Sequence, residues 1–248
     1  IPLVITSLGI AIAFKMQFWN IGGEGQIAIG SFAASYFALY MNDMPMPLML
    51  TVMIIAGVLA GGIWALIPAF FKAQWGTNET IVTLMMNYIG LKWVMFLQYG
   101  PWRDPKSLGF PKIANFPQNA VLPKLLGVHV GWVIALILVA AVYIFINHTK
   151  KGYEIAVIGE SMNTARYAGI NIKKTILIAI MLSGGLCGLV GMIQASAVNG
   201  TLSVEITGGV GYTAIITAWL AALSAPLILI VSILFAALLE GGSYIQTV

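Results

Sequence analysis

Residues 47–71 read PLMLTVMIIAGVLAGGIWALIPAFF, an apolar run of 25 residues without one charged side chain. A helix needs about 20 mostly apolar residues to cross a bilayer, so this run is long enough to span a membrane. The whole chain has the same character, with 60% hydrophobic and 8% charged residues, whereas about 25% of the residues of a soluble domain are charged. Twelve Lys and Arg with eight Asp and Glu cannot coat a soluble protein of 248 residues. The sequence predicts an integral membrane protein.

Other apolar stretches lie on both sides of this run, at residues 1–14, 27–41, 81–97, 130–146, 175–197 and 211–239. The last is too long for one span, and Pro226 divides it because proline lacks a backbone donor and disfavours helix in the residue before it. We therefore expect a short helix over 212–223 and a full span from Pro226. The stretch 27–41 is short for a span unless residues 22–26 belong to the same element.

The predicted fold is an all-α, polytopic transmembrane helix bundle with discontinuous helices, forming a single domain over residues 1–248. Interrupted hydrophobic segments in both halves of a chain are typical of transporters in which broken helices meet near the substrate path. An apolar run is already under way at Ile1, and another ends just before the C-terminus. These ends predict a fragment truncated at both termini.

Loop charge predicts the orientation of the bundle in the membrane. The loop 149–174 should be cytoplasmic because basic residues gather in inward-facing loops, and this loop carries Lys150, Lys151, Arg166, Lys173 and Lys174. Loops then alternate, with 98–129, 42–46 and 198–209 outside and 72–79 inside. The external loop 98–129 contains five prolines and should be an irregular cap. Within the cytoplasmic loop, we expect a short helix over 161–168.

Several functional classes find no support in the sequence. The net charge of +4 comes from basic residues in short loops, not from the basic stripe of a nucleic-acid-binding protein. The lone Cys187 and the two separated histidines, His129 and His148, predict no metal site and no cofactor. Residues 182–186 read LSGGL, close to the signature of ABC ATPases, but the chain has no G-x-x-x-x-G-K-[ST] phosphate loop. We therefore expect no enzyme active site.

The string FWNIGGEGQ at residues 18–26 interrupts apolar sequence with a carboxylate and two amides. A carboxylate at membrane depth is costly and usually faces a bundle interior or a cavity, so Glu24 is a candidate for the substrate path, together with Asn20 and Gln26. A structural alternative is that Glu24 and Gln26 cap the start of a helix, where negative charge suits the helix dipole.

A second polar set has the spacing of one helical face, with Thr80, Thr83 and Asn87 three and four residues apart. This face should point into the bundle, where it could bind a neutral polar solute or join helices through hydrogen bonds. Asn78 should cap the start of that helix. Farther along, Gly184 and Gly188 have the G-x-x-x-G spacing that permits tight helix crossing.

Three strings together resemble one family, the inner-membrane permeases of ABC importers for branched-chain amino acids and simple sugars. They are AFKMQFWNIGGEGQ at 13–26, GTNETIVTLMMNYI at 76–89, and KKGYEIAVIGE followed by ARYAGIN at 150–171. They are most similar to the branch that works with basic-membrane-lipoprotein-type binding proteins and is associated with nucleoside uptake. The resemblance implies a multi-pass subunit of the bacterial plasma membrane that forms the path for a nucleoside or a simple sugar.

The same resemblance implies the partners: a second permease subunit, two cytoplasmic ABC ATPase subunits and an external solute-binding lipoprotein. It makes residues 161–170 the helix that couples to the ATPase, although Ser161-Met162 stands where family members often carry Asn-Pro. The implied coupling residues are Gly159, Glu160, Ser161, Ala165, Arg166, Gly169 and Ile170. Two alternatives remain open from the residues alone, an ion-coupled secondary transporter and a membrane scaffold that transports nothing.

Overall fold

The computed structural model describes residues 1–41, 43–107, 109–125 and 127–247 of the chain. Asn42, Leu108 and Leu126, which fall in two of the three loops predicted to be external, lie outside the described residues, as does Val248. The helices are α1 (Pro2–Lys15), α2 (Gly23–Tyr40), α3 (Met46–Trp75), α4 (Glu79–Tyr99), α5 (Gly131–His148), α6 (Lys150–Glu160), α7 (Met162–Tyr167), α8 (Ile172–Ile193), α9 (Val210–Leu220) and α10 (Ala225–Thr247). The predicted all-α helix bundle is confirmed.

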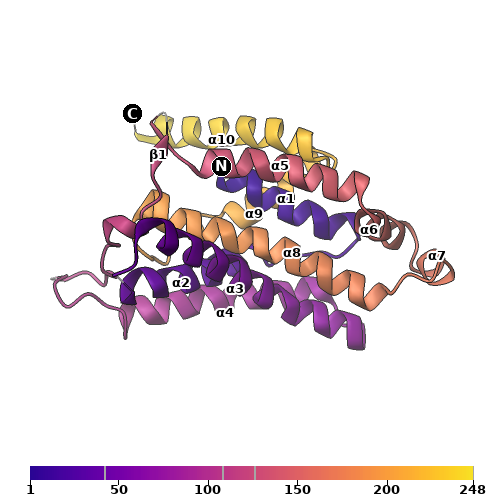
Figure 1. The fold of residues 1–248 in the computed structure, drawn as a ribbon, viewed down its shortest axis with the longest axis horizontal. Coiled ribbons are helices and arrows are strands. Elements are labelled where there is room, and N and C mark those ends of the chain that lie inside the picture. The colour runs from indigo at the N-terminus through magenta and orange to yellow at the C-terminus, as the bar shows by residue number, and fades with distance from the viewer. Residues whose placement is uncertain (42, 108, 126, 248) are drawn as a thin grey trace.

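The long helices run side by side along one axis (Figure 1). One end of the bundle, called here the α7 end, carries α6 and α7. The opposite end, the hairpin end, carries a short 3-10 helix (Gln118–Ala120) and the antiparallel strands β1 (Lys124–Leu125) and β2 (Val128–His129). In Figure 1, α10 and α5 form the upper edge of the bundle, α4 forms the lower edge and α8 runs between them.

Among the described residues, five helices are long and apolar enough to cross a membrane: α3, α4, α5, α10, and α8 with the π-helical turn (Gln194–Asn199) that extends it. Of these, α8 is the central one. In its most apolar stretch 72% of the residues are buried, against 17–28% in the other four helices. Close helix crossing explains this position. A Cβ added at Gly184 would meet the Gly61 carbonyl oxygen at 2.6 Å, and one at Gly188 would meet the Gly61 Cα at 2.9 Å. The predicted tight crossing at Gly184 and Gly188 is confirmed.

Three further apolar helices, α1, α2 and α9, are short or interrupted, and α9 packs against both α1 and α2. Helix α1 is buried along most of its length. Helix α2 begins at Gly23, so the polar residues before position 27 do belong to the same element as the apolar stretch, as its length required. Helix α9 ends at Leu220, and α10 begins at Ala225, one residue before the predicted start. Between them, Ala222 and Leu223 take positive φ angles of 49° and 56°, so the break before Pro226 is a sharp turn.

The loop 149–174 is more ordered than predicted. The short helix expected over 161–168 is present as α7, but residues 150–160, for which no helix was expected, form α6. Thr149 caps α6, Ser161 caps α7 and Asn171 caps α8, each with a side-chain oxygen that accepts from a backbone N–H. These caps explain how the chain bends twice over a short distance, since each satisfies a donor at a new helix start.

Candidate functional site

A non-helical linker, residues 16–22, joins α1 to α2 inside the bundle, and α4 supplies its hydrogen bonds. Ile21 N donates to Thr83 Oγ1 at 3.3 Å, and Asn87 Nδ2 donates to the Ile21 carbonyl at 2.8 Å. Asn87 Oδ1 also accepts from Gly25 N, in the first turn of α2, at 2.8 Å. Thr83 and Asn87 are fully buried. The polar face of α4 therefore replaces the backbone bonds that the linker loses by leaving helical geometry.

Asn20 and Gln26 form a reciprocal amide pair beside this contact. Asn20 Nδ2 donates to Gln26 Oε1 at 3.2 Å, and Gln26 Nε2 donates to Asn20 Oδ1 at 2.9 Å. Asn20 Nδ2 also donates to Ser183 Oγ on α8 at 3.1 Å, while its Oδ1 accepts from Gly22 N at 3.1 Å. The pair thus ties the linker to α2 and to the central helix α8.

Glu24 connects α2 to α9. Its Oε1 accepts from Gly211 N, in the first turn of α9, at 2.8 Å, and only 1% of Glu24 is exposed. The two helix starts touch directly, since a Cβ at Gly211 would lie 2.5 Å from Glu24 N and 2.9 Å from the Gly23 carbonyl carbon. A carboxylate is suited to this point because a helix N-terminus carries partial positive charge and unpaired N–H groups.

The structure brings the two predicted polar strings into one place, which we call the central polar cluster: Asn20, Glu24, Gln26, Thr83, Asn87 and Ser183. Thr80, predicted with them, is half-buried, and its backbone carbonyl accepts from Thr83 Oγ1 at 3.1 Å. Sequence reasoning missed three participants, Ser183, Gly211 and Tyr212, whose hydroxyl accepts from Asn87 Nδ2 at 3.3 Å. Each stands singly in an apolar run, so no periodic pattern singles it out.

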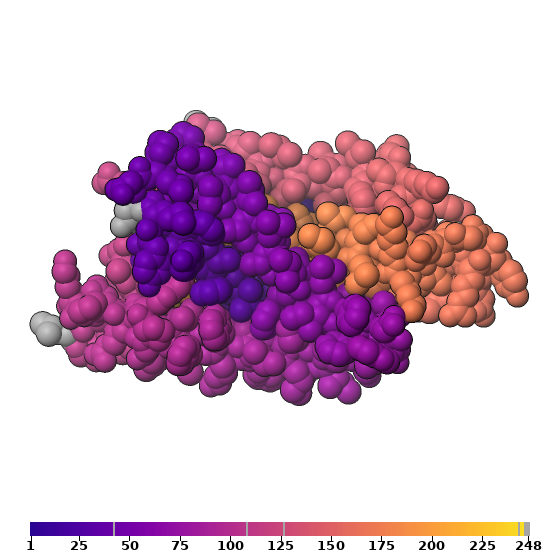
Figure 2. All heavy atoms as spheres, turned by 60° about the horizontal axis from the view of Figure 1, so that its bottom comes forward, coloured from indigo at the N-terminus to yellow at the C-terminus, as the bar shows by residue number. Residues whose placement is uncertain are grey.

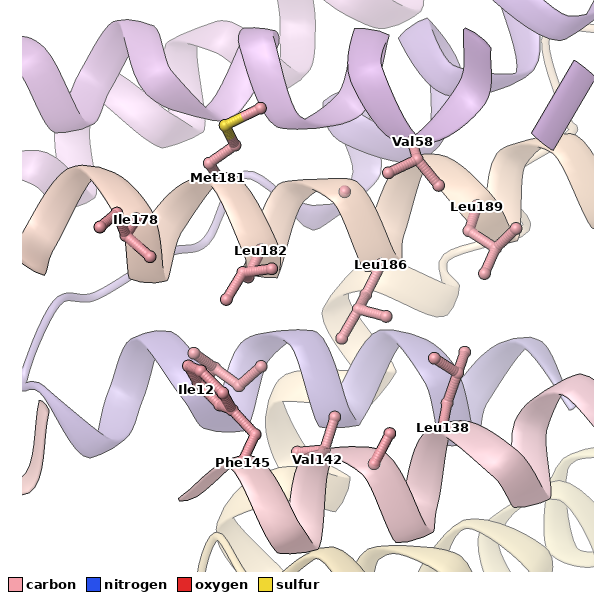
Figure 3. Close-up of a pocket in the computed structure, with 12 residues that line it drawn as sticks. Ile12, Val58, Leu138, Val142, Phe145, Ile178, Met181, Leu182, Leu186 and Leu189 are labelled. Atoms are coloured by element: carbon pink, nitrogen blue, oxygen red, sulfur yellow. The ribbon is translucent and has the colours of Figure 1, made fainter. Parts of the chain in front are cut away.

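A second feature is an apolar cavity of about 490 Å³ between α8 on one side and α1 and α5 on the other. Figure 3 shows aliphatic and aromatic side chains pointing into this gap, among them Ile12, Leu138, Phe145 and Leu186. A neutral polar solute would lose its hydrogen bonds to water there without replacement, which is unfavourable. This cavity is therefore a poor candidate for the solute path.

The predicted coupling residues gather at the α7 end. Ser161 Oγ accepts from Thr164 N at 3.2 Å and so starts α7, and Gly169 ends the turn after it with a φ of 72°. Arg166 and Glu160 are exposed, and Ala165 is buried. A hollow of about 590 Å³ lies between α7, the end of α3 and the start of α8, with Arg166 and Ile170 in its lining.

Helix α6 links α7 to the bundle at two points. Gly159 packs on the Lys15 carbonyl at the end of α1, where no Cβ would fit. Glu154 Oε2 accepts from Lys151 Nζ at 2.5 Å and from Thr175 Oγ1, in the first turn of α8, at 2.9 Å. The hydrogen bond from Lys151, together with that from Thr175, holds the pKa of Glu154 below its ordinary value although burial acts to raise it. Glu154 therefore stays ionised at neutral pH.

Within the described residues, no group of three or more His, Cys, Asp or Glu side chains could hold a metal ion. The site is a network of hydrogen bonds between broken helices, with a separate surface at the α7 end.

Comparisons with known proteins agree with this reading. The sequence model of the family described as "Branched-chain amino acid transport system / permease component" matches residues 1–248. The chain is 30% identical to a glucose ABC transporter permease protein of Haloferax volcanii, over 99% of this chain and 68% of the relative. It is also 30% identical to a guanosine permease protein of Bacillus subtilis and to a nucleoside permease protein of Lactococcus lactis, over 97% of this chain and 69% of each relative. No solved structure matches the chain.

The family assignment decides between the alternatives left open by the residues. An ion-coupled secondary transporter and a non-transporting scaffold would share the helix bundle but not a match over the full chain to ABC permeases. The spans, the broken helices and the family model agree over the same residues. The chain therefore belongs to the family of branched-chain amino acid transport system permease components and is the permease subunit of an ABC importer, a multi-pass protein of the plasma membrane.

Proposed function

We propose that this permease forms the membrane path for a nucleoside or a simple sugar. The solutes of its relatives support this solute class, since one relative is a permease for guanosine, one for nucleosides and one for glucose. The external binding protein selects the solute, and the membrane subunits pass it on.

The working importer contains a second permease subunit, two cytoplasmic ABC ATPase subunits and an external solute-binding lipoprotein. ATP is hydrolysed by the ATPase subunits, because this chain has no phosphate-binding loop of its own. The α7 end faces the cytoplasm, since the loop 149–174 carries Lys150, Lys151, Arg166, Lys173 and Lys174. Residues 98–129 at the hairpin end then form the external cap.

The observation that carries the proposal is the connection from α7 to the broken helices. Helix α7 stands at the tip of the bundle (Figure 1), where an ATPase subunit can reach it. Movement of α7 is passed to α6, and from α6 to the end of α1 through Gly159 and to the start of α8 through Glu154. Helix α1 continues into the linker 16–22, and α8 carries Ser183, so both routes lead to the central polar cluster.

The predicted path residues Asn20, Glu24, Gln26, Thr83 and Asn87 shape the path by fixing where α2 and α9 begin. Their side chains bind other parts of this chain, so we assign them to the wall that holds the path and to the change between its two conformations. A conformational change driven by ATP requires an element with two arrangements, and two helices that begin inside the bundle and are joined by a few hydrogen bonds meet that requirement.

The coupling route is tested with the complete importer in vesicles. The double variant Arg166→Glu with Gly169→Pro alters the charge of the α7 tip and the positive φ that ends its turn. We expect normal membrane insertion, and ATP hydrolysis that no longer responds to the solute-loaded binding protein. Lys124→Glu, an equal charge reversal on an exposed residue at the hairpin end, serves as the control. An unchanged ATPase response in the double variant would refute the coupling role.

The solute class is tested on the partner that selects it. Co-purification with this chain identifies the ATPase and the lipoprotein, and a thermal-shift screen of that lipoprotein compares nucleosides with simple sugars. We expect a rise in Tm with one of these two classes. A lipoprotein that responds only to amino acids would overturn the proposed solute, while leaving the family assignment intact.

A further inference from the structure

Helix α4 carries polar side chains on two faces. Among the described residues, only one of these faces makes hydrogen bonds to other elements. The buried face carries Thr83 and Asn87. The opposite face, which we call the open α4 face, carries Met85, Tyr88, Lys92 and Tyr99 at spacings of three, four and seven residues, which align along a helix. Tyr88 is 55% exposed and Tyr99 61% exposed. Figure 2 shows α4 along the lower edge of the molecule, with this side uncovered.

The open α4 face is chemically unlike the other exposed helix faces. The same share of the apolar stretch, 28%, is buried in α3, α4 and α5. In the middle of α3 and α5 the exposed side chains are aliphatic: Ile55, Leu59 and Ile63, and Leu136 and Ile137. Lipid accounts for those two faces. In α4, Tyr88 and Lys92 are exposed beside Ile89 and Phe96, and lipid does not account for the hydroxyl and the ammonium group.

Lys92 shows this difference most clearly. It lies seven residues before the end of α4, about 10 Å from that end at the rise of a helix. Its ammonium group donates to Met95 Sδ at 3.7 Å, and no acidic side chain pairs with it among the residues that the structure describes. A charged side chain within a span usually faces the bundle interior or a water-filled cavity. A hollow of about 400 Å³ lies beside it, bordered also by Phe96 and Tyr99.

Tyr88 adds an independent observation, because it lies close to the midpoint of α4. Tyrosines in membrane proteins gather at the two interfaces, where the hydroxyl reaches water or headgroups. Snorkelling could bring Lys92 to a headgroup, but a tyrosine hydroxyl at the middle of a span is too deep to do so. Both residues are accommodated together if water and a polar solute lie against this face.

We propose that the open α4 face lines the solute path, between this chain and the second permease subunit, and that Lys92 donates hydrogen bonds to the solute. This inference rests on the proposed function for its solute, but not for the placement of the face. An ammonium group offers three donors and no acceptor, so its complement is a hydroxyl or carbonyl oxygen. The exposed tyrosine rings provide planar surfaces for a ring. A nucleoside carries both features.

Placement is tested by cysteine labelling of the assembled importer in membranes. Tyr88→Cys and Lys92→Cys are compared with Ile63→Cys on α3 and Ile137→Cys on α5, which are 57% and 62% exposed in the wild type. The native Cys187 is buried, and the unaltered chain serves as the blank. We expect a charged, water-soluble thiol reagent to modify positions 88 and 92 but not 63 and 137. Absence of thiol modification at position 88 would overturn the proposal. Modification at position 92 alone would indicate a lysine anchored at lipid headgroups.

Solute contact is tested by uptake into vesicles that contain the complete importer. Lys92→Leu should lower uptake about tenfold, the loss expected for one hydrogen bond to a charged group, and Lys92→Arg should restore most of it. Uptake at the wild-type rate by Lys92→Leu would show that Lys92 does not bind the solute. Labelling requires no solute, so position 88 reports on the face even when nucleosides prove to be the wrong class. Failure of the proposed function and failure of this placement are thereby distinguished.

Discussion

Two helices begin inside the bundle, and their starts are held in different ways. Around the start of α2, amides and hydroxyls from α4 and α8 make several bonds, through Asn87, Thr83 and Ser183. The start of α9 follows two glycines with positive φ angles, Gly208 at 54° and Gly209 at 76°, and one side chain, that of Glu24, accepts from its Gly211 N–H. The start of α2 is therefore held by several side chains, whereas the start of α9 is held by fewer, Glu24 at Gly211 N and Asn87 at the Tyr212 hydroxyl.

This difference suggests which helix moves during transport. Removing one of several bonds leaves a helix start in place, whereas a start that is held by few bonds is freed more easily. Hydrogen bonds between membrane helices contribute about 0.6 kcal/mol on average, so one of them is easily exchanged when an ATPase pushes on α7. We expect α2 to act as the fixed wall and α9 as the movable element. Substitutions at four positions test this, from the largest expected effect to the smallest.

Gly211→Val should break both starts at once. A Cβ at this position would lie 2.5 Å from Glu24 N and 2.9 Å from the Gly23 carbonyl carbon, both backbone atoms that cannot turn away. We expect destabilisation at or above the roughly 1–3 kcal/mol of an overpacked core, measured as a lower Tm and lower yield of the purified subunit. Gly242→Val, at a position with open space around the glycine, is the control and should match the wild type. An equally stable Gly211→Val would show that the two starts do not need their close contact.

Asn87→Leu should loosen α2 without preventing insertion into the membrane. It removes the acceptor for Gly25 N and the donor to the Ile21 carbonyl, both at 2.8 Å. Two buried backbone groups then lack partners, which costs about 1–3 kcal/mol each. Ile89→Leu, two residues away and exposed, provides the baseline for denaturant unfolding in detergent. A loss under about 1 kcal/mol would mean that other contacts hold the linker.

Glu24 variants separate charge from hydrogen bonding at the start of α9. Glu24→Gln keeps an oxygen that can accept from Gly211 N, whereas Glu24→Leu removes it. We expect the Leu variant to lose about 1–3 kcal/mol of stability and the Gln variant about 0.3–1 kcal/mol, the usual size of a charge at a helix N-terminus. Uptake should fall in the same order. Equal losses in both variants would indicate that the negative charge, not the accepted hydrogen bond, fixes α9.

The spans were predictable because apolar runs of sufficient length leave few alternatives. The limits of α3 and α5 shifted by only a few residues, and the break before Pro226 lies where proline chemistry puts it. Helix α6 was missed because its sequence is polar, and its helical structure depends on the Thr149 cap and on packing against α1 and α8. The helix propensity of residues 150–160 alone does not reveal this packing.

The sequence predicted most members of the central polar cluster, but not which of them contact one another. Glu24 and Asn87 stand out as polar residues in apolar surroundings, and a helical period places Thr83 beside Asn87. Their meeting joins residues 62 positions apart, and the bond from Gly211 to Glu24 spans 187. Such contacts depend on which helices cross one another, and a local pattern such as G-x-x-x-G shows where a helix can cross but not which helix it meets.

Ser183→Ala should have the smallest effect, because it tests the redundancy around α2 directly. The hydroxyl accepts from Asn20 Nδ2 at 3.1 Å, but the same amide nitrogen also donates to Gln26 Oε1. We expect a loss of about 0.6 kcal/mol or less and nearly normal uptake. Ser35→Ala, whose hydroxyl binds a carbonyl within its own helix, is the matched control. A loss as large as that of Asn87→Leu would mean that the start of α2, like that of α9, is held by few contacts, and the assignment of one fixed and one movable start would fail.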